Sequence, residues 1–227
     1  MLPRVLEPEV MDTQAEARDY DAMDHRQVNE RFVSDLLAVL DADRLGLHRD
    51  TVDVLDVGTG TALIPIELCR RLAPAQITAV DLSAWMLKLG RRNVREAGFA
   101  DRIRLEKVDA KAMPYADQSF EIVISNSIVH HVPDPAPVLA ELARLTARSG
   151  VLFVRDLLRP ADDRSAKRLV ATYAADANDR QRALFDASLR AALTVEEVRG
   201  LVAGLGLPER GVAPTSDRHW TWVFQRD

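Results

Sequence analysis

Three aspartates stand where apolar segments end, and one of them precedes a glycine-rich turn. Asp56, Asp81 and Asp109 each end or directly follow such a segment, and the turn spans residues 58–61. Glycine allows a positive φ and a close approach of the backbone to a ligand, and the helix start after the turn offers unpaired N–H groups. Carboxylates accept hydrogen bonds from hydroxyl and amino groups. This combination favours a nucleoside site.

The spacing suggests a role for each acid. Asp81 follows Gly58 by about 20 residues, the separation at which an acid accepts from the ribose hydroxyls of a nucleotide held by a glycine turn. Asp109 ends the next apolar segment, where a carboxylate can accept from an adenine amine. Each acid taken singly has an alternative interpretation as a helix cap, but the three together favour binding.

Extended and helical patterns alternate along the chain, which is typical of a parallel sheet covered by helices. Strands are predicted over 52–57, 76–80, 103–108, 121–125, 151–155 and 220–225. Helices are predicted over 29–40, 62–73, 84–97 and 136–147, with two more inside 162–192 and one from 194 to about 204 or 206. Ligands of such α/β sheets bind at the carboxyl ends of the strands, where the acids lie.

From Asn29 to Arg155 the chain resembles the class I S-adenosylmethionine-dependent methyltransferases of the small-molecule type, similar to the ubiquinone and menaquinone biosynthesis group. The matching residues are 56–61, Asp81, Asp109-Ala110 and 120–131. The resemblance implies an α/β, Rossmann-like methyltransferase sheet of seven strands, mostly parallel with the last strand antiparallel, and helices on both faces. It also implies S-adenosyl-L-methionine as cofactor and S-adenosyl-L-homocysteine as product. One departure is Ala62, where a third glycine is frequent; the small residue should keep the turn.

The resemblance implies a set of cofactor-binding residues. They are Tyr20, Asp56, Gly58, Thr59, Gly60, Asp81, Leu82, Met86, Asp109, Ala110, Asn126, Ser127 and His131. Asp56 suits the ammonium of the methionine part, directly or through water. Tyr20 lies on an N-terminal arm that would fold over the cofactor as a lid, or it is an ordinary half-buried tyrosine. Met86 would lie against adenine, although a methionine at helical spacing is most often core.

His130 and His131 are the clustered histidines of the chain, in the loop where the resemblance places the transferable methyl group. An imidazole that titrates near neutrality can remove a proton from the acceptor as the methyl moves. The alternative is that one histidine closes the loop or packs on the cofactor, and the resemblance suggests that His131 touches it. No metal site is expected.

The segment after the fifth strand carries a run of basic residues: Arg155, Arg159, Arg164, Lys167 and Arg168. If they converge above the methyl group, the substrate is acidic or phosphorylated, and Tyr173 and Phe185 form the pocket wall. The alternative is a solvated helix face. We expect an arm or lid over 1–28 and a methyltransferase domain over 29–227, with a helical cap inserted at about 160–192.

Composition excludes several classes of protein. The chain has 227 residues, a formal charge of −5, 47% hydrophobic residues and one cysteine. One cysteine makes neither an internal disulfide nor a structural zinc site, which favours the cytoplasm. The N-terminus lacks a signal-peptide pattern, and no apolar run has the roughly 20 residues of a membrane span. The excess of acidic over basic residues does not indicate the basic surface that nucleic-acid binding requires.

The predicted function is methyl transfer to a small molecule, on oxygen or carbon. Asn126 is not followed by the Pro-Pro-aromatic sequence of enzymes that methylate nucleic-acid bases. A nicotinamide-binding protein is less favoured, because Leu63 stands where the dinucleotide pattern requires glycine. A non-catalytic module that keeps the fold, and perhaps the cofactor, is the other alternative. The acceptor and the oligomeric state stay open.

Overall fold

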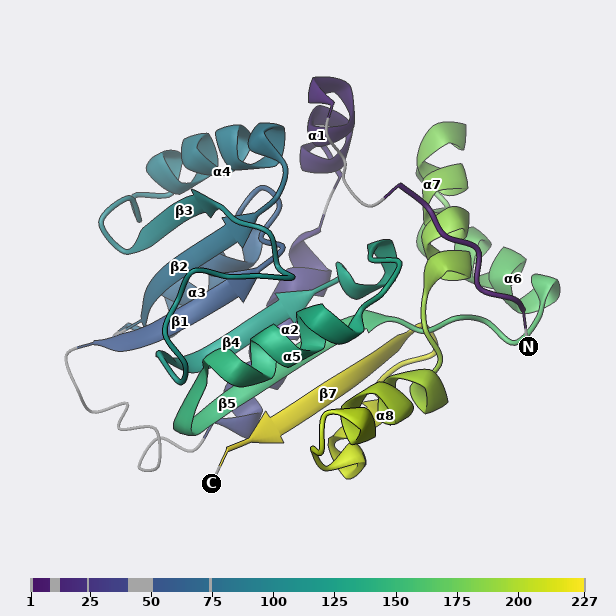
Figure 1. The fold of residues 1–227 in the computed structure, drawn as a ribbon. Coiled ribbons are helices and arrows are strands. Elements are labelled where there is room, and N and C mark those ends of the chain that lie inside the picture. Colours follow the sequence, from purple (N-terminus) through teal and green to yellow (C-terminus); the bar gives the residue numbers. More distant parts are fainter. Residues whose placement is uncertain (1, 9–12, 24, 41–50, 74, 227) are drawn as a thin grey trace.

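A single seven-stranded sheet forms the centre of the computed structural model (Figure 1), which describes residues 2–8, 13–23, 25–40, 51–73 and 75–226. The strand order is β3-β2-β1-β4-β5-β7-β6. The strands are β1 (Val52–Val57), β2 (Ala75–Asp81), β3 (Ile103–Lys107), β4 (Phe120–Asn126), β5 (Thr146–Leu157), β6 (Val212–Pro214) and β7 (His219–Gln225). Strands β1 to β5 pair in parallel, and β7 runs antiparallel to both β5 and β6. This confirms the predicted sheet.

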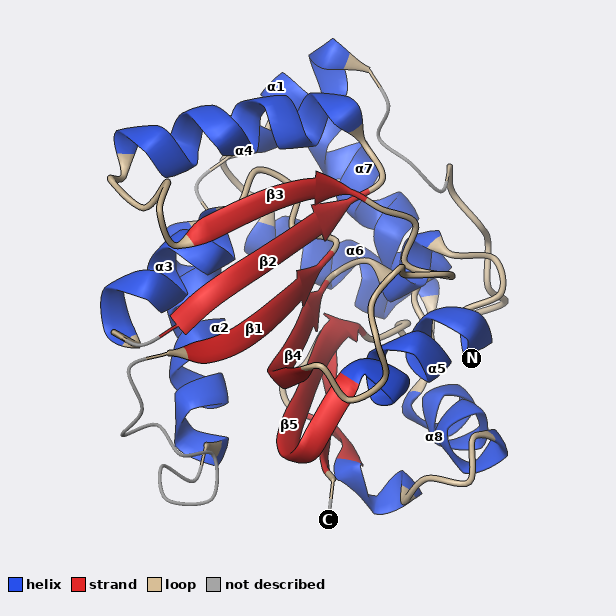
Figure 2. Ribbon diagram, turned by 60° about the vertical axis from the view of Figure 1, so that its left-hand side comes forward, coloured by secondary structure: helices blue, strands red, loops and turns tan. Residues whose placement is uncertain are grey.

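Helices cover both faces of the sheet (Figure 2). They are α1 (Gln14–Asp21), α2 (Arg26–Val39), α3 (Leu63–Arg71), α4 (Ala84–Glu96), α5 (Ala136–Leu145), α6 (Asp163–Tyr173), α7 (Asp179–Ala191) and α8 (Val195–Gly204). Helices α2, α3 and α4 pack on one face and α5 and α8 on the other. Strand residues alternate between the two layers, with Val54 in the first and Leu55 in the second, as period-two geometry requires.

Short polar signals set the helix boundaries. Ser83 caps α4 by accepting from the backbone N–H of Met86. Thr194 and Glu197 form a capping box at the start of α8.

Cys69 of α3 lies in the core, since it is 3% exposed, and burial raises the pKa of its thiol to about 11.

Two elements were not predicted as such. The arm contains helix α1, opened by a capping box between Thr13 and Glu16, and this helix packs against α4. Strand β6 spans three residues and ends in a proline, so it is too short to show a period. The seventh strand was expected from the resemblance and not from a local pattern.

Helices α6 and α7 follow β5, as two helices were expected there, and they pack together through Leu169 and Leu189. Residues 2–8, here named the strap, run beside α7 (Figure 1). The Val5 N–H donates to the carbonyl of Arg190, and the Arg4 guanidinium donates to the carbonyls of His130, Val132, Pro133 and Ala191. The strap therefore joins α7 to the loop after β4. Among the described helices, none is long and apolar enough to cross a membrane.

Candidate active site

The turn after β1 folds back on β2. The N–H groups of Gly58 and Thr59 both donate to the carbonyl of Val80, at 2.8 and 2.9 Å. Gly58 has φ +75°, and a Cβ at this position would overlap Ile128. Ala62 has φ +64°, so the departure from glycine keeps the left-handed conformation that the family pattern implies. The turn thus requires glycine at 58 for two separate reasons.

Asp81 ties the glycine turn to the end of β2. One carboxylate oxygen accepts from the Gly60 N–H and the other from the Ser83 N–H, both at 2.8 Å. Burial raises the pKa of Asp81, against the effect of these hydrogen bonds. Each carboxylate oxygen has two lone pairs, so acceptor capacity remains for ligand hydroxyls.

Asp56 lies below the turn and is only 2% exposed. Burial raises its pKa to about 7, and the charge of Asp81 acts in the same direction. Within the described part of the chain, its Oδ2 has no hydrogen-bond partner. An ionised carboxylate in this place needs a cation or a donor from a ligand.

Tyr20 of α1 covers the glycine turn. Its ring carbon Cε1 lies 3.5 Å from the place where a Cβ of Gly60 would stand, and its ring stacks on that of His25 with centroids 4.4 Å apart. Burial, together with the charges of Asp81 and Asp56, raises the pKa of Tyr20 to about 12. The arm therefore places Tyr20 over the glycine turn, and its role as a lid stays a prediction.

All of the predicted cofactor residues line two adjoining cavities, here together named the central pocket. The two cavities share Tyr20, Gly58 and Asn126. The larger is lined, among others, by Gly60, Asp81, Leu82, Met86, Asp109, Ala110, Ser127 and His131, and the smaller by Asp56 and Thr59. Asp109 accepts from the Lys111 N–H at 2.9 Å and lies 3.5 Å from Lys111 Nζ. Segments from four strand ends thus meet in one place.

The two histidines, on the short helix η1 (Val129–His131), have different surroundings. His130 is 3% exposed, does not line the central pocket, and its Nδ1 lies 2.5 Å from Asp156 Oδ1. Burial opposes the charged imidazole, but the Asp156 carboxylate outweighs burial and the pKa of His130 is raised. His131 lines the central pocket; burial, with the charge of His130, lowers its pKa to about 4. Of the two, His131 is placed to meet a ligand.

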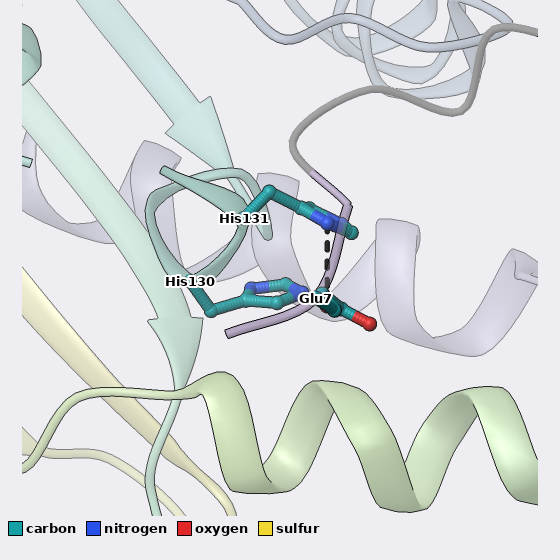
Figure 3. Close-up of side chains that lie close together, drawn as sticks. All are labelled: Glu7, His130 and His131. Carbon is teal, nitrogen blue, oxygen red and sulfur yellow. Dashed lines mark ion pairs between the residues drawn. The ribbon is translucent and has the colours of Figure 1, made fainter. Parts of the chain in front are cut away.

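Two residues beside the histidines were not predicted as site residues. Asp156 stands at the end of β5 and is fully buried; it also accepts from the N–H groups of Val129 and Leu157, both at 2.6 Å. Glu7 of the strap points between the imidazoles (Figure 3), with Oε1 3.4 Å from His130 Nε2 and 3.2 Å from His131 Nδ1. Asp156 ends a strand as the other three acids do, so the same signal points to it. No sequence signal marks Glu7.

None of the five basic residues lines the central pocket, so they do not converge there. Arg155 is buried and pairs with Asp35 at 2.8 Å, while Arg159 pairs with Glu197 at 2.5 Å. Three further basic residues on α6 are exposed, as the solvated-face alternative expected: Arg164, Lys167 and Arg168. Acids from α2 and α8 pair with Arg155 and Arg159, and the three residues on α6 face solvent.

Tyr173 and Phe185 do not form a wall of the central pocket. Tyr173 is 45% exposed, lies under the Arg218 guanidinium and donates to Asp217. Phe185 packs against the apolar cluster that joins α6 to α7. Neither residue lines the central pocket.

Comparison with known proteins agrees with this geometry. Residues 55–154 match the family model described as a methyltransferase domain, which spans β1 to most of β5. Over these residues the chain resembles the class I S-adenosylmethionine-dependent methyltransferases. The match includes the glycine turn, Asp81, Asp109 and both histidines.

Curated relatives match part of the chain. Malonyl-[acyl-carrier protein] O-methyltransferase of Halorhodospira halophila is 38% identical over 142 residues, covering 63% of this chain and 44% of the relative. The ubiquinone/menaquinone biosynthesis C-methyltransferase UbiE of Geobacter sulfurreducens is 32% identical over 121 residues, covering 53% of this chain and 47% of the relative. The chain thus spans about half the length of the curated relatives it matches.

A solved structure supports the fold over nearly the whole chain. The plantazolicin methyltransferase BamL, in complex with a triazolic desmethylPZN analog and SAH, superposes with a TM-score of 0.71 at 16% identity. The match covers 94% of this chain and 91% of BamL. The fold therefore extends beyond the family match, through β7.

Proposed function

We propose that this methyltransferase transfers the methyl group of S-adenosylmethionine to an oxygen or carbon atom of a small molecule, with S-adenosylhomocysteine as product. The observation that carries the proposal is the central pocket itself. It brings together a glycine turn, three strand-end acids and one imidazole from segments that are far apart in the sequence. A nucleoside with a cationic amino-acid part matches this set of groups.

Each part of the cofactor has a counterpart among these residues. Asp81 would accept from the ribose hydroxyls, and Asp109 from the adenine amine. Leu82, Met86 and Ala110 would provide apolar contact with the base. The unpartnered Oδ2 of Asp56 would accept from the methionine ammonium, which supplies the cation that this buried carboxylate needs.

The protein would promote the reaction by positioning the methyl acceptor and by excluding water from the site. The sulfonium methyl is already electrophilic, so the protein has to hold the acceptor in line at near-attack distance. Tyr20 covers the glycine turn on one side of the central pocket, and His131 borders the other end. A catalytic role for His130 or His131 stays a prediction, and the geometry favours His131 because only that ring borders the pocket.

The acceptor is proposed to be a small molecule and not a nucleic acid. Asn126 lines the central pocket without the sequence that base-methylating enzymes carry after it. The basic side chains that would have bound a phosphate are paired or exposed. Helices α6 and α7 are proposed to form a cap on the acceptor side, and residues 1–28 to act as the lid.

Calorimetric titration with S-adenosylhomocysteine tests the cofactor site. Asp81→Ala should weaken binding at least about tenfold, because ribose hydroxyls lose their charged acceptor. Asp101→Ala, an exposed aspartate before β3, is the matched control and should bind as the wild type does. Absence of binding by the wild type, or equal binding by both variants, would contradict the proposal.

Turnover needs a separate measurement, because an intact cofactor site is also compatible with a non-catalytic module. Release of S-adenosylhomocysteine is followed while the protein is incubated with S-adenosylmethionine and pools of small hydroxylated or carbon-acid compounds. We expect product formation with at least one compound class and none with Asp81→Ala. Cofactor binding without product from any pool would favour the non-catalytic alternative.

A further inference from the structure

Glu7, His130 and His131 bring one carboxylate and two imidazoles together beside the central pocket (Figure 3). One ligand atom from each residue lies within 4.8 Å of the other two. The carboxylate comes from the strap and both imidazoles come from η1, so distant parts of the chain supply the set. The three side chains are 9%, 3% and 18% exposed, respectively.

The distances agree with coordination of a shared ion. Glu7 Oε1 lies 3.4 Å from His130 Nε2 and 3.2 Å from His131 Nδ1. Metal–ligand bonds of about 2.0 to 2.2 Å place the donor atoms of neighbouring ligands about 3 to 3.5 Å apart. The two observed separations already fall in that range. The nitrogen atoms of the two imidazoles lie within 4.8 Å of each other and would move closer together around an ion.

Two polar atoms of this cluster lack hydrogen-bond partners among the described residues. Glu7 Oε1 and His131 Nδ1 are both buried, and neither has a hydrogen-bond partner among the described residues. Their close approach lacks hydrogen-bond geometry, and buried polar atoms without partners are costly. A cation between them would satisfy both atoms at once.

The surroundings already orient two of the three donors, those of His130 and Glu7. His130 Nδ1 is held by Asp156, which leaves Nε2 facing Glu7, and a carboxylate behind a histidine is the usual support of a metal ligand. Ser188 of α7 donates to Glu7 Oε2 at 3.3 Å, which leaves Oε1 facing the imidazoles. Arg4 fixes the strap through carbonyls of two separate segments, residues 130–133 and the end of α7, so the place of Glu7 does not depend on an ion.

We propose that Glu7, His130 and His131 bind a divalent transition-metal ion such as Zn²⁺. Two imidazoles and one carboxylate are a ligand set of zinc and of related first-row ions, and three protein ligands leave coordination positions open. His131 also lines the central pocket, so an open position faces the acceptor side. If the proposed function holds, an acceptor with a hydroxyl or carboxylate oxygen would bind there, and a bound hydroxyl would lose its proton more readily.

Zinc titration of the full chain tests the site directly. The protein is stripped with a chelator, dialysed, and titrated with ZnCl₂ in competition with a chromophoric chelator. We expect about one equivalent to bind, and at least about tenfold weaker binding by Glu7→Gln and by His131→Gln. His219→Gln removes a histidine outside the cluster and should bind zinc as the wild type does. No binding by the wild type, or equal binding by all variants, would overturn the site.

A second variant separates coordination from a local ion pair. Asp156→Asn should weaken zinc binding by about 10- to 100-fold through the orientation of His130, with circular dichroism confirming that the variant folds. Co²⁺ is the spectroscopic probe, because its visible bands report three protein ligands in the wild type and should change in His131→Gln. Bands that are identical in these two proteins would contradict coordination by His131.

The same proteins are titrated with S-adenosylhomocysteine. If the ligand binds and zinc does not, the metal site is wrong and the proposed function is unaffected. If zinc binds and the ligand does not, the proposed function fails and the metal site stands.

Discussion

The two sides of the central pocket are built in different ways. The cofactor side uses the ends of β1, β2 and β3, where backbone N–H groups and short motifs meet in adjacent strands. The acceptor side combines the strap, η1, the end of β5 and α7, which lie more than a hundred residues apart in the chain at their extremes. A local sequence motif therefore describes the first side, while the second exists only after the chain has folded.

The largest effect is expected on the cofactor side, from Gly58→Ala. The added Cβ meets Ile128 and the residue must keep a positive φ, so the change should destabilise the fold by about 2 to 4 kcal/mol and abolish binding of S-adenosylhomocysteine. Gly200→Ala in α8 is the control, because a Cβ there meets nothing within 4 Å and alanine favours a helix. Thermal unfolding and calorimetry measure both. Unchanged stability of Gly58→Ala would mean that the turn is misplaced.

Arg4→Ala should weaken zinc binding on the acceptor side and leave ligand binding on the cofactor side nearly unchanged. Loss of the hydrogen bonds to η1 and α7 frees the strap and removes Glu7 from the histidines, so zinc binding should weaken by at least about tenfold. Affinity for S-adenosylhomocysteine should change by less than about threefold. Leu6→Ala, a change of an exposed strap residue, should alter neither property. Equal losses of zinc and cofactor affinity would show that the two sides are not independent.

Asp56 should make cofactor binding depend on pH. The pKa of Asp56 is about 7 in the free protein, and a bound ammonium would lower it. At a pH between these two pKa values, ligand binding must therefore release a proton from Asp56. Affinity for S-adenosylhomocysteine should therefore fall about tenfold from pH 8 to pH 6, relative to Asp56→Asn. The comparison with the variant cancels titration of the ligand itself. Parallel pH profiles for the two proteins would place the ammonium elsewhere.

The smallest effect is expected at Tyr20. Tyr20→Phe keeps the ring over Gly60 and should weaken cofactor binding by less than about threefold, whereas Tyr20→Ala uncovers the turn and should cost about five- to tenfold. Both affinities are measured by calorimetry. A larger loss for Tyr20→Phe would indicate that the hydroxyl, and not the cover, binds the ligand.

The sequence predicts the cofactor side well for a physical reason. Strands buried on both faces appear as continuous apolar runs, and the acid or glycine that ends each run marks the edge of the sheet. Thus β1 spans 52–57 as predicted, and Asp56, Asp81 and Asp109 line the central pocket. Their roles in binding stay predictions until a ligand is measured.

The acceptor side is less predictable because its contacts depend on tertiary structure. Glu7 lies in a polar segment without a period, and hydrogen bonds of the strap to η1 and α7 bring it to the histidines. Arg155 and Arg159 stand in a basic run, but the acids that pair with them come from α2 and α8. A charge pattern alone therefore leaves both convergence and a solvated face open for this segment.

A crystal structure of the full chain with S-adenosylhomocysteine tests the central claim most directly. The account predicts the ribose hydroxyls on Asp81, the adenine amine at Asp109, the ammonium at Asp56 and the sulfur directed toward His131. A ligand bound elsewhere, or one in the central pocket with its ribose away from Asp81, would contradict it.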